Sequence, residues 1–306
     1  MSLCPPLIVI VGPTAVGKTH LAIELALRLN GEVVSADSRL FYRGMDIGTA
    51  KPSLEERRGV PHHLIDVAEP DETWSLALFQ QKARAAIQEI HERNRLPFLV
   101  GGTGQYVRAV TEGWTPPEVH PNPRLRSVLE HLAEHHSPYW LHDKLKMLDP
   151  SAAVSIDPRN LRRTVRALEV IFSTGRPFSA QRQSGQSPYH LLTLGLTRPR
   201  DELYRRIDER IEAMFAHGLL NEVEALLEKG YSPNLPAMSA IGYREAAAVL
   251  RGQMTLEEAK TQMKRLTRVF VRRQANWFKV NDPSIQWFHA GKVSIDEIEH
   301  FLRQKL

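Results

Sequence analysis

The stretch IVIVGPTAVGKTHLAIELA, residues 8–26, decides the fold of this 306-residue chain. It begins within an apolar run, Leu7–Val11, that predicts a buried strand. The next eight residues follow the pattern G-x-x-x-x-G-K-[ST] and are Gly12, Pro13, Thr14, Ala15, Val16, Gly17, Lys18 and Thr19. Apolar residues at helical spacing come directly after them. Strand, glycine-rich loop and helix in this order form the context in which the pattern makes a phosphate-binding loop.

The chemistry of such a loop is anion binding. Its glycines let backbone N–H groups converge on a phosphate, and the following helix N-terminus adds partial positive charge. Lys18 is expected to contact phosphate oxygens, and the Thr19 hydroxyl is expected to hold Mg²⁺. Kinases and nucleotide hydrolases add an apolar strand ending in Asp, and both Glu32–Asp37 and Leu64–Asp66 loosely qualify. The loop alone therefore predicts phosphate and Mg²⁺ binding and leaves a nucleotide open as the ligand.

Short apolar runs and helical patterns alternate through the first third of the chain, which predicts a parallel sheet flanked by helices. The expected strands are Leu7–Val11, Glu32–Asp37, Leu64–Val67, Phe98–Val100, Leu191–Leu196 and Ile285–Phe288; the expected helices of this α/β core are Lys18–Leu29, Ser75–Arg93, Asp201–Lys229 and Thr255–Trp277. Four prolines between Trp114 and Pro123 mark a connector, and Arg124–Phe172 has helical spacing. We therefore expect a core of residues 1–115 and 190–306, interrupted by an all-helical insertion over residues 116–189.

Composition indicates a globular protein of the cytoplasm. The single cysteine, Cys4, excludes an internal disulfide, and no apolar run approaches the roughly 18 residues of a membrane span. The net charge of +5 is unevenly spread: Asp157–Arg182 carries six Arg and two acidic residues, and Lys264–Lys279 carries six Lys or Arg and no acid. Such local basic segments are typical of a polyanion-binding surface, although solvated helix faces would look the same.

Five further stretches fall into one family pattern. They read DSRLFYRGMDIGTAKP (37–52), PHHLID (61–66), GGTGQY (101–106), RALEV (166–170) and RRQANWF (272–278). In this order behind the phosphate loop, they resemble the bacterial tRNA dimethylallyltransferase (tRNA isopentenyltransferase) family over essentially the whole chain. The resemblance implies a P-loop kinase-like α/β core with a helical insertion.

The resemblance also implies a reaction. The family transfers a dimethylallyl group from dimethylallyl diphosphate to N6 of the adenine at position 37 of tRNA, next to the anticodon, and releases diphosphate. By the same resemblance the loop holds the leaving diphosphate, Asp37 is the catalytic carboxylate, and Thr19 carries Mg²⁺. Arg206 matches best as the arginine that reaches the diphosphate, with Arg205 and Arg210 as competitors.

Carried over residue by residue, the resemblance also predicts contacts with the tRNA anticodon stem-loop. The matching positions are Asp37, Ser38, Arg39, Leu40, Thr103, Arg126, Arg162, Arg163, Thr164, Val165, Arg166, Met238, Ser239, Ala240, Ile241, Gly242 and Tyr243. In the basic segment 264–279, Arg265, Arg268 and Arg272 share one helix face at spacings suited to phosphates. Arg39, Gln105 and Val269 depart from the family pattern, which leaves details of tRNA contact open.

Three other functions remain open at this stage. A P-loop small-molecule kinase or hydrolase would need only the loop and an Asp. A prenyltransferase acting on free adenine nucleotide would share the reaction but would not need the two basic segments, and a non-catalytic RNA-binding protein would not need the intact loop. We expect a monomer without membrane contact.

Overall fold

The structure is a computed structural model that describes residues 4–114, 117, 119–181 and 185–306. The chain divides into two compact units. Unit 1 comprises residues 1–111 and 187–306, and unit 2 comprises residues 112–186. The expected start of the insertion at residue 116 lies outside the described residues, as does Arg182 of the first basic segment.

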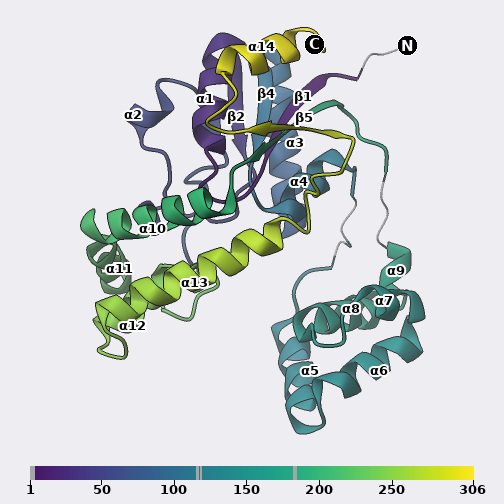
Figure 1. Cartoon of the computed structure of the whole chain (residues 1–306). Coiled ribbons are helices and arrows are strands. Elements are labelled where there is room, and N and C mark those ends of the chain that lie inside the picture. The colour runs from purple at the N-terminus through teal and green to yellow at the C-terminus, as the bar shows by residue number, and fades with distance from the viewer. Residues whose placement is uncertain (1–3, 115–116, 118, 182–184) are drawn as a thin grey trace. The chain divides into compact units, whose positions relative to one another are not determined.

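Unit 1 is built on a six-stranded sheet in the order β3-β2-β4-β1-β5-β6 (Figure 1). Its strands are β1 (Pro6–Val11), β2 (Gly31–Ser35), β3 (His62–His63), β4 (Leu96–Val100), β5 (His190–Thr197) and β6 (Ile285–His289). Every pair of neighbouring strands is parallel. The predicted parallel sheet is therefore confirmed. Its central strand, β1, is buried on both faces and leads into residues Gly12–Thr19.

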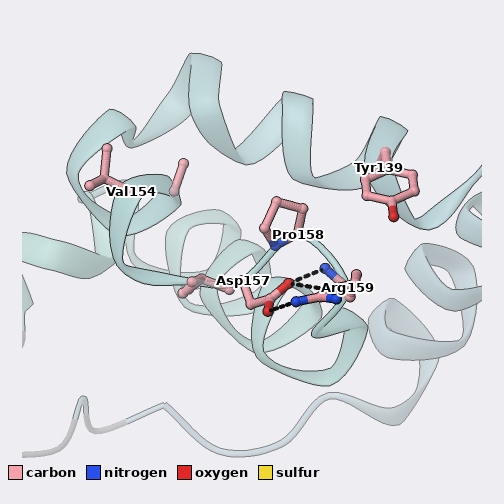
Figure 2. A pocket seen from close by; sticks show the side chains of 7 residues that line it. Tyr139, Val154, Asp157, Pro158 and Arg159 are labelled. Atoms are coloured by element: carbon pink, nitrogen blue, oxygen red, sulfur yellow. Dashed lines mark hydrogen bonds and ion pairs between the residues drawn. The ribbon is translucent and has the colours of Figure 1, made fainter.

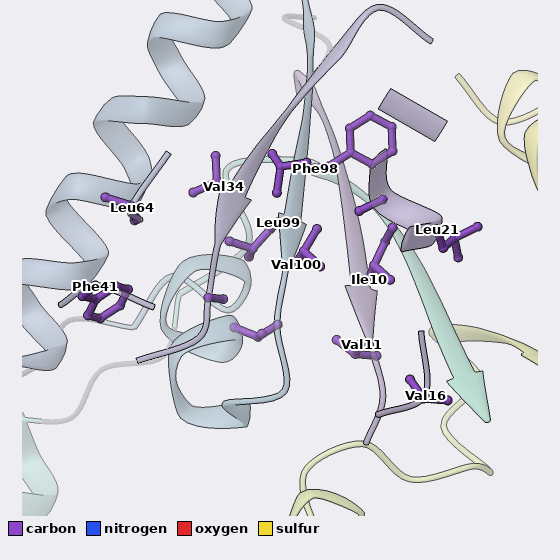
Figure 3. Close-up of a cluster of buried hydrophobic side chains, with 14 of the residues drawn as sticks. Ile10, Val11, Val16, Leu21, Val34, Phe41, Leu64, Phe98, Leu99 and Val100 are labelled. Carbon is purple, nitrogen blue, oxygen red and sulfur yellow. The ribbon is translucent and has the colours of Figure 1, made fainter. Parts of the chain in front are cut away.

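Helices cover both faces of this sheet. The crossover from β1 to β2 contains α1 (Lys18–Arg28), and the crossover from β3 back to β4 contains α3 (Leu76–Glu92). Right-handed crossovers that run in opposite directions along a sheet place their helices on opposite faces. The apolar stripes of both helices are buried against the strands, and Figure 3 shows part of this core, where Ile10, Val34 and Leu99 lie together. Burying each such side chain contributes about 1.5–3 kcal/mol.

A group of helices lies at the carboxyl ends of the strands. It contains α10 (Arg200–Ala216), α11 (Leu219–Glu228), the 3-10 turn η1 (Ala237–Ser239), α12 (Tyr243–Leu250) and α13 (Leu256–Gln274). Figure 1 shows α10 and α13 side by side, and they are in contact. Unit 1 also contains α2 (Leu54–Arg57), α4 (Gly104–Thr111) and α14 (Ile295–Arg303), which packs against α1.

Two predicted elements are wrong. The expected helix Asp201–Lys229 is two helices, because Gly218 adopts a left-handed φ of +95° between α10 and α11; the apolar stripe continued across the break and hid it. The expected strand Leu64–Val67 is also absent, since Leu64 and Asp66 have φ values of +61° and +56°. The neighbouring ladder with β2 uses His62 and His63 instead.

Every regular element among the described residues of unit 2 is a helix. The helices are α5 (Pro123–His135), α6 (Pro138–Leu148), α7 (Pro150–Ser155), α8 (Leu161–Thr174) and α9 (Phe178–Gln181). The side chains of Asn122, Ser137, Asp149 and Asn160 each accept a backbone N–H at a helix N-terminus. Leu129, Leu145 and Leu168 belong to a separate core in this unit. The prediction of an all-helical insertion is thus confirmed.

A buried carboxylate holds α5 to α8. The side chain of Glu169 is 0% exposed and accepts two hydrogen bonds of 2.8 Å from the Arg126 guanidinium. It also accepts from Arg166 (2.6 Å) and from the Asn122 backbone N–H (2.7 Å). Although burial alone would raise it, these donors hold the pKa of Glu169 down at about 2. Arg126 and Arg166 therefore have a structural partner in addition to any ligand.

We expect Glu169→Gln to destabilise the folded chain by about 3 kcal/mol at pH 7, because it removes one charge from a buried pair. A lowered carboxyl pKa stabilises the fold above the unfolded pKa of about 4.5 and loses that effect as the pH falls towards 2. The stability gap between wild type and variant should therefore narrow from pH 4.5 downwards. Urea unfolding, followed by circular dichroism at each pH, measures the free energy of unfolding of both proteins.

The matched control is Glu134→Gln on the exposed side of α5, which should leave the stability of the chain unchanged at every pH. A constant gap between wild type and Glu169→Gln from pH 7 to pH 2 would contradict the assignment.

Candidate active site

Four adjacent strands, β2, β4, β1 and β5, end at the same edge of the sheet. Their carboxyl ends lead into Asp37, the Gly101–Thr103 turn, the Gly12–Thr19 loop and the α10 segment with Arg206. In parallel α/β sheets, ligands bind outside this edge. The parallel register is what brings together residues that are far apart in the sequence.

The Gly12–Thr19 loop has the geometry that its pattern predicts. Gly12 adopts a φ of +144°, and a Cβ there would lie 2.6 Å from the Leu196 carbonyl oxygen of β5, so only glycine fits. Gly17, with a φ of +111°, precedes the first residue of α1 and faces open space. The loop therefore presents its backbone and the N-terminus of α1 to an anion.

Lys18 is the half-buried cation of this loop. Its ammonium donates to the carbonyl oxygens of Gly12 (3.0 Å) and Pro13 (2.8 Å). Burial lowers the pKa of Lys18 to about 8; the Asp37 carboxylate opposes that effect, and Arg210 adds to it. Lys18, Asp37 and Arg210 thus lie close enough to act on one another's charge.

A cavity of about 780 Å³ opens over the loop. It is lined by Thr14, Ala15, Gly17, Lys18, Thr19, His20, Ile23, Asp37, Leu40, Thr49, Ala50, Pro52, Glu56, Arg58, Val100, Gly101, Arg206, Glu209, Arg210 and Ala213. All of these residues belong to unit 1. The cavity brings the predicted phosphate loop, the predicted catalytic Asp37 and two of the three candidate arginines into one site.

The Asp37 carboxylate is oriented by its own loop. Its Oδ1 accepts the backbone N–H of Arg39 (3.0 Å), and the Asp37 N–H donates to Ser35 Oγ (3.3 Å). Among the described residues, Oδ2 accepts no hydrogen bond. One oxygen therefore fixes the side chain and the other is available to a ligand.

Two arginines of α10 line the cavity, one turn apart. Arg206 Nε donates to the Ala15 carbonyl of the phosphate loop (2.9 Å), and Arg210 donates to the Thr49 carbonyl (3.0 Å). Burial lowers the pKa of Arg210 below its usual value, yet a guanidinium remains charged in proteins. Arg205 is exposed and does not line the cavity, so two cations remain as candidates for contact with an anion.

The loop over residues 46–52 forms another wall of the cavity. Glu222 of α11 holds it by accepting the backbone N–H groups of Asp46 (3.0 Å), Ile47 (2.7 Å) and Gly48 (3.2 Å). The Tyr243 hydroxyl donates to the same carboxylate (2.5 Å), and burial raises the pKa of that hydroxyl. This network gives a packing reason for the family-like stretch around Gly48.

Lys51 stabilises the same loop through ion pairs. Its side chain is 4% exposed and pairs with Asp46 (2.5 Å) and Asp66. Asp66, which the sequence left open as a second strand-end metal ligand, is thus engaged in an ion pair and does not line the cavity. Asp37 is the strand-end carboxylate that faces the site.

The predicted tRNA contacts fall into two groups in unit 1. Ser38, Arg39, Leu40 and Thr103 are half-buried near the cavity, and the Arg39 guanidinium donates to the carbonyl oxygens of Pro236 (3.1 Å) and Ala237 (3.4 Å). In the other group, Ser239 is exposed and Ile241 half-buried, whereas Met238, Ala240, Gly242 and Tyr243 are buried. The buried side chains pack the core, so their contribution to binding a large ligand is indirect.

In unit 2, Arg162 and Arg163 are exposed at the start of α8, while Thr164 and Val165 are buried. Unit 2 also contains a hollow of about 690 Å³, shown in Figure 2. There Arg159 is paired with Asp157, with its Nε 3.0 Å from Oδ1. None of the predicted site residues lines this hollow.

Sequence reasoning missed two residues that shape the site: Glu222, described above, and Gln274 of α13. Gln274 accepts the backbone N–H of Thr14 (2.9 Å) and donates to the Gly102 carbonyl (3.1 Å). Gln274 lies in the stretch RRQANWF, in which the basic residues alone suggest a contact with a ligand. The available signal for Gln274 was a polar residue at a position where the helical spacing of α13 predicts a buried side chain.

Comparison with known proteins gives a consistent result. The family described as IPP transferase matches residues 40–281. The chain is 53% identical over 283 residues to a tRNA dimethylallyltransferase of Thermomicrobium roseum, covering 92% of this chain and 86% of that protein. A tRNA dimethylallyltransferase of Roseiflexus sp. is 56% identical over 274 residues, covering 90% of each.

Solved structures agree. The tRNA isopentenylpyrophosphate transferase of Bacillus halodurans superposes with a TM-score of 0.73 at 46% identity, covering 98% of this chain and 96% of that one. A eukaryotic dimethylallyltransferase, described as acting on tRNA, gives a TM-score of 0.81 at 29% identity, covering 98% of this chain and 77% of that one.

A cavity in which a phosphate loop faces a carboxylate and two arginines is typical of P-loop α/β enzymes that act on a phosphorylated substrate. Fold alone would not choose among the reactions of that class. The chain belongs to the IPP transferase family, and it is a transferase.

The titration of Lys18 should control anion binding. Because the pKa of Lys18 is about 8, the ammonium that attracts a polyanion is lost above that pH. We expect the affinity for inorganic diphosphate to fall about tenfold between pH 7 and pH 9, the change in the protonated fraction of one group. Isothermal titration calorimetry at fixed Mg²⁺ measures the affinity.

The comparison variant is Lys18→Arg, whose guanidinium stays charged over this range. Any ionisation of diphosphate itself affects both proteins equally. The affinity of the variant should therefore depend less on pH than that of the wild type; identical pH profiles would contradict the assignment to Lys18.

Proposed function

We propose that this transferase moves a dimethylallyl group from dimethylallyl diphosphate to N6 of the adenine at position 37 of tRNA, 3′ to the anticodon, and releases diphosphate. The observation that carries the proposal is that the Gly12–Thr19 loop and Asp37 share one cavity. The names of the relatives, tRNA dimethylallyltransferases at more than 50% identity, support this substrate pair.

The reaction needs both parts of the cavity. The N6 amine attacks the first carbon of the dimethylallyl group, the carbon–oxygen bond breaks, and diphosphate leaves with the bonding electrons. The amine must also lose a proton. Asp37 Oδ2 is free to accept that proton while Oδ1 remains hydrogen-bonded to the Arg39 N–H, and a positioned base of this kind contributes about 10²–10⁴ to a rate.

Charge compensation for the leaving diphosphate comes from three cations of the same cavity. Lys18, Arg206 and Arg210 line the cavity, and the backbone N–H groups at the start of α1 add fixed partial charge. Arg206 uses one N–H donor for the Ala15 carbonyl, and Arg210 uses one for the Thr49 carbonyl. A guanidinium has five N–H donors, so the rest can bind phosphate oxygens.

We assign the Mg²⁺ position to Thr19, whose exposed hydroxyl lines the cavity. Among the described residues, no group of three or more His, Cys, Asp or Glu side chains could hold a metal ion. This fits Mg²⁺, which usually takes few protein ligands and completes its shell with substrate phosphates and water. When bound, the ion would neutralise charge that develops on the diphosphate.

For the tRNA we propose two surfaces, one in each unit. On α13, Arg265, Arg272 and Arg273 are exposed, whereas Arg268, expected on the same face, pairs with Asp208 of α10 (2.6 Å). In unit 2, Arg162 and Arg163 are exposed. A small nucleotide would need neither surface, which favours the tRNA anticodon stem-loop over free adenine nucleotide.

We also propose that the protein acts as a monomer in the cytoplasm. The loop, Asp37 and the two arginines that the reaction needs all come from unit 1 of this chain, and the one cysteine of the sequence fits a reducing compartment. Across the part of the chain that the structure describes, no helix has the length and apolar character of a membrane span.

One assay tests the proposal. The protein is incubated with Mg²⁺, radiolabelled dimethylallyl diphosphate and either unmodified tRNA with adenine at position 37, or AMP or ATP. Label in tRNA supports the proposal, and label only in the nucleotide supports prenylation of free nucleotide. Consumption of ATP without label transfer would overturn the prenyltransferase assignment in favour of a kinase or hydrolase.

Asp37→Ala should lower the rate of label transfer to tRNA by about 10²–10⁴, because the amine loses its proton acceptor. Its affinity for tRNA, measured by gel shift, should stay within about threefold of wild type, since phosphate contacts supply most of that affinity. Asp71→Ala, an exposed carboxylate of the same unit that does not line the cavity, is the control and should transfer normally. A large loss of tRNA binding in Asp37→Ala would mean that Asp37 anchors the base instead.

A further inference from the structure

Gln274 is a buried polar residue that the reaction chemistry leaves without a role. It is the last residue of α13, is 4% exposed, and lies 260 positions from Thr14 in the sequence. Its Oε1 accepts the Thr14 backbone N–H (2.9 Å) and lies 3.3 Å from the Thr14 hydroxyl. Its Nε2 donates to the Gly102 carbonyl (3.1 Å). The side chain therefore spans two loops of the active site.

The orientation of this amide is fixed by its partners. A backbone N–H can only donate and a carbonyl can only accept, so the oxygen must face Thr14 and the nitrogen must face Gly102. The fit is close: a Cβ on Gly102 would lie 2.2 Å from Nε2. Only a glycine at 102 lets the amide enter, which explains the second glycine of the stretch Gly101–Thr103.

The loop on the Gly102 side is in turn packed against the residue before Asp37. A Cβ on Gly101 would lie 2.5 Å from the Ala36 carbonyl oxygen, and the Ala36 N–H donates to the Val100 carbonyl (2.8 Å). A shift of the Gly101–Gly102 turn would therefore move Asp37 as well. Through Thr14 and Gly102, Gln274 links the phosphate loop to the side of the cavity that carries Asp37.

Helix α13 is also joined to α10 by ion pairs. Lys264 pairs with Glu212 (2.6 Å) and Arg268 pairs with Asp208 (2.6 Å), and both acids lie on α10. Helix α10 also carries Arg206, which donates to the phosphate loop at Ala15. Gln274 thus extends from a helix that is anchored to α10. This makes it suited to hold Thr14 and Gly102 at a constant distance from each other.

We propose that Gln274 is a positioning residue that sets the separation between the departing diphosphate and the Asp37 carboxylate. The inference rests on the proposed function, in which the first group sits on the Gly12–Thr19 loop and the second receives the amine proton. Transfer requires the reacting atoms within about 3–3.5 Å, and a misplacement of about 1 Å can cost roughly 10²-fold in rate. Gln274 does not itself line the cavity.

The first test is Gln274→Leu, which keeps the volume and removes both bonds. At a temperature well below unfolding, we expect kcat for tRNA prenylation to fall by about 10–100-fold, the usual cost of losing a residue that orients a site. The KM for tRNA should stay within about twofold, because the exposed arginines of α13 are untouched. The Kd for inorganic diphosphate, measured by calorimetry, should rise a few-fold as Thr14 loses its acceptor.

The matched control is Gln80→Leu. Gln80 is also buried in unit 1 and bonds the Ala109 carbonyl of α4, and it does not line the cavity. It should lower the melting temperature without lowering kcat. If both variants lose kcat equally, or if Gln274→Leu keeps the wild-type kcat, the positioning role is overturned.

Gln274→Glu adds a pH readout that a merely structural loss would not show. A protonated carboxyl repeats the amide pattern, with an oxygen that accepts from Thr14 and an O–H that donates to Gly102, whereas a carboxylate would face the Gly102 carbonyl without a donor. The ratio of its kcat to that of wild type should rise as the pH falls from 8 to 6. A flat ratio, as expected for Gln274→Leu, would contradict the paired hydrogen bonds.

These outcomes separate the two proposals. If wild-type protein transfers no label to tRNA, the proposed function fails whatever Gln274 does, and the diphosphate Kd still reports on the link to Thr14. If wild type transfers label and Gln274→Leu does so equally well, only the positioning role fails.

Discussion

The desolvated ammonium of Lys18 is the constraint around which the rest of the site is arranged. Two carbonyls of its own loop hold it, and burial brings its pKa down to about 8. A cation in that state gains most from a polyanion, since binding restores the charge that burial disfavours. Asp37 supports the charge of Lys18 and Arg210 opposes it, so the charge of Lys18 depends on both neighbours.

That arrangement requires a rigid frame, and the frame is supplied by distant parts of the chain. Glu222 holds the wall over residues 46–48 through three backbone N–H groups. Arg206 and Gln274 both bond to the phosphate loop, from α10 and α13 respectively. A loop that binds phosphate with its backbone has few side chains that could hold its own conformation. Side chains of the neighbouring helices hold it instead. The same helix α13 carries exposed arginines, which places the proposed RNA surface and the loop support on one element.

Much of the sheet and of the Gly12–Thr19 loop was predictable because both depend on local order in the sequence. A buried parallel strand reads as an apolar run, and the glycine-rich loop with its lysine has a fixed spacing. The failures were also local: Gly218 divides a continuous apolar stripe into two helices, and left-handed residues at 64 and 66 end β3 early. An apolar pattern reports burial, and it does not report where the backbone turns.

The sequence by itself determined a glycine-rich loop between a strand and a helix, a parallel α/β sheet, a helical insertion and, through the family-like stretches, the transferase. Only the tertiary structure decided which side chains share the cavity. It put Arg206 and Arg210 there and left Arg205 outside, engaged Asp66 with Lys51, and buried Tyr243. The physical reason is that neighbours along a helix point in different directions, and the partner that each finds depends on how α10–α13 pack over the strand ends.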